Sequence, residues 1–193
     1  MDRLLIASAN PHKVQELSAL LTPLGISLVS LADLEVYGQV DEDAPTLEGN
    51  ARKKAGYWFD KTGIPTLADD TGLEVEALGG EPGVRSARYA GEDATDSENV
   101  TKLLAEMKGV ANRAARFRTV IALSGKEEKL FEGICPGSIL EEPRGAGGFG
   151  YDPLFRPEGE QRSFAELTGE EKNRISHRGR ALRNAVDYLK GLG

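Results

Sequence analysis

The first part of the chain alternates apolar runs with a segment of helical periodicity. Residues 3–8 and 26–31 are mostly apolar and predict two short strands. Between them, Asn10 is an N-cap residue and Pro11 suits the first helical position. Apolar residues then recur every three or four positions, and Gly25 follows their end. The pattern predicts a strand, a helix and a strand.

A second helix is predicted after Thr46, which is a suitable N-cap. Its apolar residues share one face: Leu47, Ala51, Ala55 and Trp58. Three polar residues lie around the turn from that face: Asn50, Lys53 and Lys54. This polar side either faces a ligand cleft or is a solvated helix surface. For each residue taken alone, the solvated surface is the favoured interpretation.

Two adjacent acids interrupt the apolar pattern in the middle of the chain. Residues 64–68 have the composition of a buried strand, and residues 73–78 alternate apolar and acidic side chains with a period of two. We expect Asp69 and Asp70 to lie where the chain leaves the sheet. Carboxylates there can hold Mg²⁺, and Asp70 can also deprotonate a bound water. The alternative is a solvated turn in which an Asp caps the local backbone.

The second half of the chain continues the alternation of strands and helices. Two capping boxes mark helix starts: Thr95 with Glu98, and Thr168 with Glu171. Apolar runs predict strands over residues 115–123, 129–133 and 138–140, the last two being separated by Pro136 and Gly137. A final helix packs through Leu182, Ala185, Val186 and Leu189. The alternation is typical of the α/β class.

Two glycine-rich segments are candidates for ligand contact. Residues 79–89 are rich in Gly and Pro and predict a long functional loop. Residues 145–150 hold four glycines, which allow a backbone to approach a ligand closely, and Phe149 and Tyr151 can stack on a base or enclose it. The spacing matches neither a P-loop nor a dinucleotide motif.

Basic residues at helix starts are candidates for anion binding. Lys13 stands in the first turn of its helix, where backbone N–H groups already favour a phosphate, although a surface lysine is the plain alternative. His177 lies in a cationic stretch with Lys172, Arg174 and Arg178. We expect at least one of these to bind an anionic ligand.

Composition narrows the classes of function. The chain has 193 residues and a net charge of −7, with 31 acids against 24 Lys and Arg, so it should repel a nucleic-acid polymer. No apolar run approaches the roughly 18 residues of a membrane span, and the N-terminus lacks the pattern of a signal peptide. The single Cys135 is interpreted as a packing residue in a reducing compartment. We therefore expect a cytoplasmic protein, and any anionic ligand that it binds must be small and held locally.

Five ordered motifs together resemble one known family. They are Ser8–Lys13, Ala68–Leu73, Leu78–Tyr89, Gly147–Pro153 and Glu170–Leu182. The chain resembles the inosine triphosphate pyrophosphatase family, also called Ham1-like, over nearly its whole length. It departs from the family pattern at Ser8, usually Thr, at Ala9, usually Gly, and at residues 47–50, where Phe-Glu-Glu-Asn is usual.

The resemblance implies an activity and a set of site residues. The activity is Mg²⁺-dependent hydrolysis of deaminated purine nucleoside triphosphates (ITP, dITP, XTP) to the monophosphate and pyrophosphate. Asp70 would be the general base and a metal ligand, with Glu42, from a predicted acidic loop over residues 35–45, as a second ligand. The triphosphate would be held by Ser8, Ala9, Asn10, Pro11, His12, Lys13, Thr71 and Lys172. The sugar and base would be framed by Phe149, Gly150, Tyr151, Asp152, His177 and Arg178.

The resemblance also implies an α/β fold with an elongated mixed sheet flanked by helices, in two lobes with a central cleft. It further implies one domain over residues 1–193 and a homodimer that binds no nucleic-acid polymer and no membrane. Two alternatives remain, a related pyrophosphatase for other modified or ordinary nucleotides and a nucleotide-binding regulator without turnover. The intact Asp70 and Lys13 argue against the regulator.

Overall fold

A computed structural model of the chain describes residues 2–34, 36, 38 and 40–191. Within these residues seven strands pair in the order β2-β1-β3-β5-β6-β7, and β4 pairs with β3. The strands are β1 Arg3–Ile6, β2 Ser27–Ser30, β3 Thr66–Val75, β4 Pro82–Gly83, β5 Ala114–Ser124, β6 Lys129–Ile139 and β7 Phe155–Pro157. The helices are α1 Pro11–Leu21, α2 Leu47–Thr62, α3 Asp96–Glu106, α4 Gly169–Ile175 and α5 His177–Lys190. β1 pairs in parallel with β2 and with β3, whereas β4 pairs antiparallel with β3 and β7 pairs antiparallel with β6. The predicted mixed sheet is therefore confirmed.

The chain divides into two compact units. Unit 1 comprises Met1–Asp70, Thr119–Gly133 and Arg178–Gly193, and unit 2 comprises Thr71–Arg118 and Ile134–His177. The strands β3, β5 and β6 each contribute residues to both units. The expectation of a single domain over residues 1–193 stays a prediction, and each unit is described by itself.

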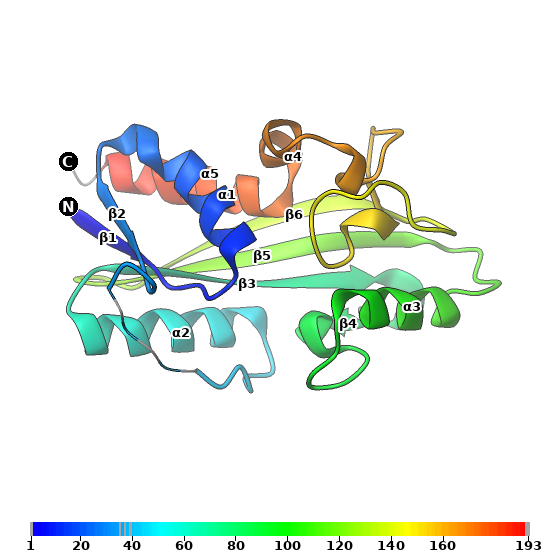
Figure 1. The fold of residues 1–193 in the computed structure, drawn as a ribbon, viewed down its shortest axis with the longest axis horizontal. Helices are drawn as coiled ribbons and strands as arrows, with labels where there is room; N and C mark the ends of the chain where they lie inside the picture. Colours follow the sequence, from blue (N-terminus) through cyan, green and yellow to red (C-terminus); the bar gives the residue numbers. More distant parts are fainter. Residues whose placement is uncertain (1, 35, 37, 39, 192–193) are drawn as a thin grey trace. The chain divides into compact units, whose positions relative to one another are not determined.

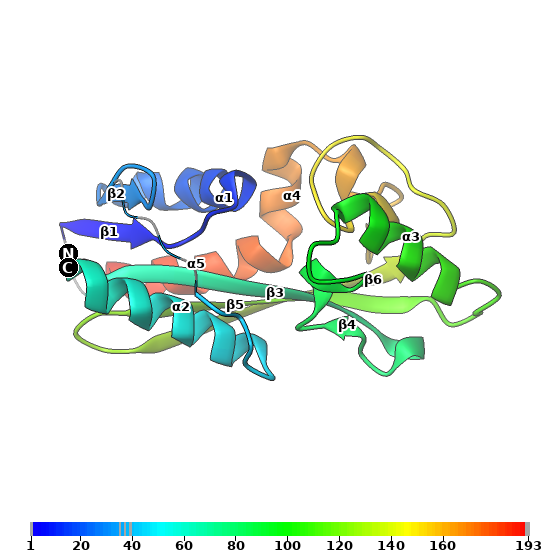
Figure 2. The ribbon, with the colours of Figure 1, turned by 60° about the horizontal axis from the view of Figure 1, so that its bottom comes forward.

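Unit 1 places helices on both faces of its strands. Figure 1 shows α1 and α5 on one side of β3 and α2 on the other, and the turned view of Figure 2 brings α2 forward. The core on the side of α1 and α5 includes Leu4, Ile6, Leu17, Leu21, Leu67, Ala181, Leu182, Ala185 and Leu189. On α2 the predicted apolar face is buried through Leu47, Ala51, Ala55 and Trp58. The helical patterns of the sequence are thus confirmed for α1, α2 and α5.

The acidic pair does not lie at a strand exit. β3 is one continuous strand of 10 residues, and Asp69 and Asp70 are buried in its middle. The predicted break into two strands is therefore wrong, and so is the alternative of a solvated turn. Gly72 is part of the reason, because a Cβ there would lie 2.5 Å from the carbonyl oxygen of Gly83 on β4. Glycine here permits close pairing of β3 with β4 rather than a turn.

A second strand is also longer than its pattern suggests. The two short strands expected around Pro136 and Gly137 form the single strand β6 of 11 residues. Gly137 pairs with Pro157 of β7, and a Cβ on Gly137 would lie 2.4 Å from the carbonyl oxygen of Arg156. The carbonyl of Pro136 accepts a hydrogen bond from the N–H of Glu158 at 2.9 Å. Pro-Gly is accommodated inside the strand because β7 approaches closely there.

Unit 2 has its own aromatic core. Phe117, Phe155 and Phe164 pack against one another with ring centroids 4.8 to 6.0 Å apart. Cys135 is buried in the same core, as its interpretation as a packing residue requires. Both predicted capping boxes are present, at the starts of α3 and α4. In the part of the chain that is described, no helix has the length and apolar character needed to span a membrane.

Candidate active site

Asp69 faces α1 and α5 in unit 1. Its Oδ2 lies 3.1 Å from Nζ of Lys13 and 3.2 Å from Nε of Arg178. Arg178 also donates to the carboxylate of Glu16 on α1. The side chains of Asp69 and Arg178 are almost completely buried, with 1% and 2% exposed. Two cations therefore hold this carboxylate in place.

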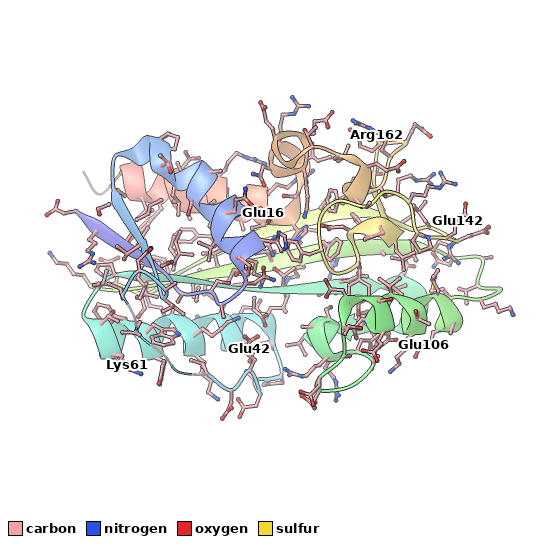
Figure 3. All side chains as sticks on the ribbon, in the orientation of Figure 1. Glu16, Glu42, Lys61, Glu106, Glu142 and Arg162 are labelled. Carbon is pink, nitrogen blue, oxygen red and sulfur yellow. The ribbon has the colours of Figure 1, made fainter. Side chains whose placement is uncertain are left out.

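Asp70 faces α2, because adjacent residues of a strand project to opposite faces. Its Oδ2 accepts a hydrogen bond from Nδ2 of Asn50 at 3.0 Å, and its Oδ1 lies 3.8 Å from Nζ of Lys54. The same ammonium lies 3.0 Å from Oε1 of Glu42. Figure 3 labels Glu42 beside α2 and Glu16 on α1, on opposite sides of β3. The two acids thus belong to different charged groups within one unit.

The pKa values of the two acids move in opposite directions. Burial alone would raise the pKa of Asp69, but Lys13 and Arg178 outweigh it and hold this pKa well below its usual range. Burial also raises the pKa of Asp70, and there the opposing effect of Lys54 and Lys13 is too weak to cancel it. The charged form is thus stabilised more strongly at Asp69 than at Asp70.

The predicted phosphate segment forms the start of α1. Asn10 caps this helix, and its Oδ1 accepts the N–H groups of His12 and Lys13 at 2.9 and 3.3 Å. Oγ of Ser8 accepts the N–H of Asn10 at 3.2 Å. Burial lowers the pKa of Lys13, against the raising effect of Asp69. The nucleotide contacts expected of Ser8, Ala9, Asn10, Pro11, His12 and Lys13 stay predictions.

A second polar cluster lies in unit 2. Nζ of Lys172, on α4, is 2.7 Å from Oδ2 of Asp152, and the same oxygen accepts the N–H of Phe149 at 2.9 Å. The ammonium of Lys172 also lies 4.7 Å from the ring centroid of Phe149. Gly148 has φ 72°, and a Cβ there would lie 2.1 Å from that Asp152 oxygen. Glycine, one ion pair and one aromatic ring together fix this loop.

The other predicted residues of unit 2 have definite surroundings. His177 is buried and stacks on Phe117 with ring centroids 4.5 Å apart. The hydroxyl of Tyr151 donates to the carbonyl of Ser86 at 2.8 Å, and its ring belongs to the core. Thr71 is half-buried and Arg174 is exposed. Of the basic stretch in unit 2, Lys172 is the residue that contacts the predicted loop.

Glu42 and Asp70 are the predicted metal ligands, and both offer carboxylate oxygens. Glu42 and Asp70 both approach one positive charge, the ammonium of Lys54. Among the residues that the structure describes, no three His, Cys, Asp or Glu side chains form a complete metal cage. Mg²⁺ usually takes one or two carboxylates and completes its shell with phosphate and water oxygens. Two carboxylates that converge on a cation fit that requirement.

The structure gathers the predicted residues into two groups. Unit 1 holds Ser8–Lys13, Glu42, Asp70 and Arg178, and unit 2 holds Thr71, Phe149–Asp152, Lys172 and His177. A pocket of about 770 Å³ in unit 2 is lined by other residues, including Glu74, Arg116, Arg156 and Glu158. None of the predicted site residues lines that pocket, so the pocket is not assigned as the candidate active site.

The interpretation of the polar residues of α2 as a solvated surface is wrong for two of the three. The solvated interpretation is correct for Lys53, which is exposed, and wrong for Asn50, which is buried against Asp70. It is also wrong for Lys54, which contacts Glu42 and Asp70. Asn50 and Lys54 are four residues apart, so they lie on the same face of α2. This spacing was the sequence signal that could have indicated a shared contact.

The mixed sheet flanked by helices defines an α/β protein, and each of its two units contains a buried polar cluster. The model of the Ham1 family matches residues 4–188, and the chain belongs to this family.

Curated relatives match nearly the whole chain. A protein of Flavobacterium psychrophilum named dITP/XTP pyrophosphatase is 48% identical, with 97% of this chain and 99% of that protein covered. A protein of the same name from Geobacter sulfurreducens is 49% identical, with 100% and 99% covered. The solved structure of a HAM1 protein from Coxiella burnetii has a TM-score of 0.90 at 40% identity, with 99% of this chain and 100% of that one covered. The resemblance and the fold class inferred from the sequence are thereby confirmed.

Proposed function

We propose that this protein hydrolyses deaminated purine nucleoside triphosphates, namely ITP, dITP and XTP, to the monophosphate and pyrophosphate. The proposal is carried by one observation: a chain with near full-length relatives named dITP/XTP pyrophosphatase holds a buried Asp70 between Asn50 and Lys54. Removal of these nucleotides from the pool is the biological role that follows.

Asp70 is proposed as the general base. Its carboxylate accepts the proton of the attacking water, and the hydrogen bond from Asn50 at 3.0 Å keeps one oxygen oriented. Asp69 is a positioning residue, because its ion pair with Lys13 fixes the lysine at the start of α1. Lys13 and Lys172 are proposed to bind the triphosphate, together with Thr71 and the segment Ser8–Lys13.

Mg²⁺ is proposed as the cofactor, held by Glu42 and Asp70. The support is the convergence of both carboxylates on the ammonium of Lys54. A bound Mg²⁺ would neutralise phosphate charge and lower the pKa of the nucleophilic water. Lys54 would leave its present position between the two carboxylates and would then be available to a phosphate oxygen.

The base is proposed to be recognised by the loop Phe149–Asp152 with His177 and Arg178. A 6-oxo purine accepts a hydrogen bond where adenine donates one, so donors aimed at that edge would disfavour ATP. GTP shares the 6-oxo group and differs from ITP by its 2-amino group. Arg178, which is bound to Asp69 and Glu16, is the candidate for excluding that group.

The test is a nucleotide panel with both phosphate products measured. We expect kcat/KM to be high for ITP, dITP and XTP and to fall by at least about 10²-fold for ATP. Pyrophosphate should be the primary product, and in ¹⁸O-labelled water the label should enter the monophosphate. Comparable efficiency on all nucleotides, or orthophosphate as the first product, would refute the proposal. Binding without turnover would favour the regulator.

A homodimer and a cytoplasmic location are also proposed, on the resemblance and on the composition respectively. Light scattering after size-exclusion chromatography measures the first directly. A measured mass of 20.8 kDa, which is the mass of one chain, would contradict the dimer.

A further inference from the structure

The loop that is proposed to frame the base is held at three consecutive residues. The N–H of Phe149 donates to Asp152 within the loop. The N–H of Gly150 donates to Oδ2 of Asp96 at 2.6 Å, and the hydroxyl of Tyr151 donates to the carbonyl of Ser86. In Figures 1 and 2 this loop passes beside the first turn of α3. Two of its three anchors therefore come from the segment Ser86–Asp96, to which the proposed function assigns no role.

Asp96 is not required to cap its own helix. The start of α3 is already capped by Thr95 and Glu98, each of which accepts a hydrogen bond from the other's backbone N–H. The bond from Asp96 instead reaches a residue 54 positions away in the sequence. Gly150 has φ 60°, in the left-handed region, and an ionised acceptor strengthens the bond that holds it there.

The segment that carries these anchors is itself rigid. The side chain of Asn99, buried on α3, accepts the N–H of Ala90 at 2.8 Å and donates to the carbonyl of Ala87 at 3.0 Å. Oγ of Ser86 accepts the N–H of Leu73 at 2.8 Å and donates to the carbonyl of Gly83 at 2.6 Å. This segment is thus fixed both to α3 and to β3. An anchor on it has a defined position.

We propose that Asp96 is a positioning residue for substrate recognition. Its carboxylate holds the amide of Gly150, and thereby sets where the neighbouring ring of Phe149 stands when the base binds. The inference rests on the proposed function of this loop. It extends that function by giving the motif Leu78–Tyr89 and the start of α3 a role as the support of the base site.

The test compares Asp96→Ala with Asp96→Asn and with Asp93→Ala. Alanine removes the acceptor, asparagine keeps an acceptor without the charge, and Asp93 is an exposed acid three residues earlier whose loss changes the net charge equally. For Asp96→Ala we expect KM for ITP to rise about tenfold with kcat changed less than about twofold. Asp96→Asn should recover most of this loss, and Asp93→Ala should behave like the parent.

A second measurement reports on the anchor without activity. Amide hydrogen exchange at Gly150, followed by NMR, should accelerate in Asp96→Ala and remain slow in Asp93→Ala, while the thermal midpoint stays close to the parent's. If exchange at Gly150 is unchanged, or if it accelerates and KM does not move, the positioning role is refuted. If the parent does not hydrolyse ITP at all, the proposed function fails, and the exchange result still decides whether Asp96 holds the loop.

Discussion

The polar clusters of the two units differ in how many charged side chains they contain and in what surrounds them. In unit 1, Asp69 and Asp70 are adjacent in one strand yet face opposite sides, where Lys13 and Arg178 contact the first and Lys54 contacts the second. In unit 2 the buried ion pair of Lys172 with Asp152 lies beside the ring of Phe149 and next to Gly148.

The two clusters suit different parts of the proposed ligand. Several buried charges of both signs create strong local fields, which shift pKa values and favour phosphate chemistry. One neutralised pair inside an apolar and glycine-rich loop provides shape and a few directed donors, which suit recognition of a base.

The largest effect should separate the two adjacent acids. Asp70→Asn keeps the shape of the side chain and removes the proton acceptor, so turnover should fall by at least about 10²-fold with little change in stability. Asp69→Asn removes the buried anion of Lys13 and leaves Arg178 with Glu16 alone, so it should cost about 3 to 5 kcal/mol of unfolding free energy and reduce turnover less. Pyrophosphate release and urea denaturation measure the two quantities. Equal effects of both substitutions on both quantities would contradict the division of roles.

In unit 2 the contributions of Lys172 and Asp152 to the free energy of unfolding should be coupled. Lys172→Met keeps the apolar stem but strands the buried carboxylate of Asp152, and we expect a loss of about 3 kcal/mol or more. Adding Asp152→Asn removes that stranded charge, so the double variant should be more stable than Lys172→Met alone. Urea denaturation of the parent, both single variants and the double variant gives the coupling energy. Strictly additive losses would show that the pair is not coupled.

Two glycines of the same loop should differ in cost. Both have positive φ, but a Cβ on Gly148 would meet Asp152 at 2.1 Å, whereas on Gly150 it would meet nothing within 4 Å. Gly148→Ala should displace Asp152 and raise KM for ITP strongly. Gly150→Ala should cost only the backbone strain, about 1 to 2 kcal/mol of stability. Steady-state kinetics with thermal denaturation compares them, and a larger rise of KM in Gly150→Ala would overturn the steric argument.

The smallest effect concerns acid stability at the start of α4. Hydrogen bonds from Arg162 and from the Thr168 cap lower the pKa of Glu171 to about 2, from an ordinary value of 4.5. Because the folded-state pKa is depressed, the stabilisation is complete above the unfolded-state pKa and is lost as the pH falls from 4.5 towards 2. The difference in thermal midpoint between the parent and Glu171→Gln should therefore shrink over this range. A constant difference would rule out this contribution.

Local signals in the sequence were sufficient for most elements. The N-caps Asn10 and Thr46 and the two capping boxes lie at the starts of the helices that they predicted. These signals work because a cap and its helix are only three or four residues apart, so the chain needs no distant partner to satisfy them. The ordered motifs also specified the family before any fold was known.

The positions and contacts of the two acids depend on residues far away in the sequence. By pattern, Asp69 and Asp70 end a strand, but in the fold they are the middle of β3, because Lys13, Asn50, Lys54 and Arg178 arrive from three helices to neutralise and hydrogen-bond them. The same holds for Gly137, which by local pattern separates two strands but lies inside β6, where a Cβ would meet the backbone of Arg156 on β7. Helix starts and family motifs could be predicted because their signals lie within short stretches of the chain. Buried charges depend on partners far away in the sequence, 109 residues for Asp69 and Arg178 and 162 residues for Glu16 and Arg178, and no local pattern records such partners.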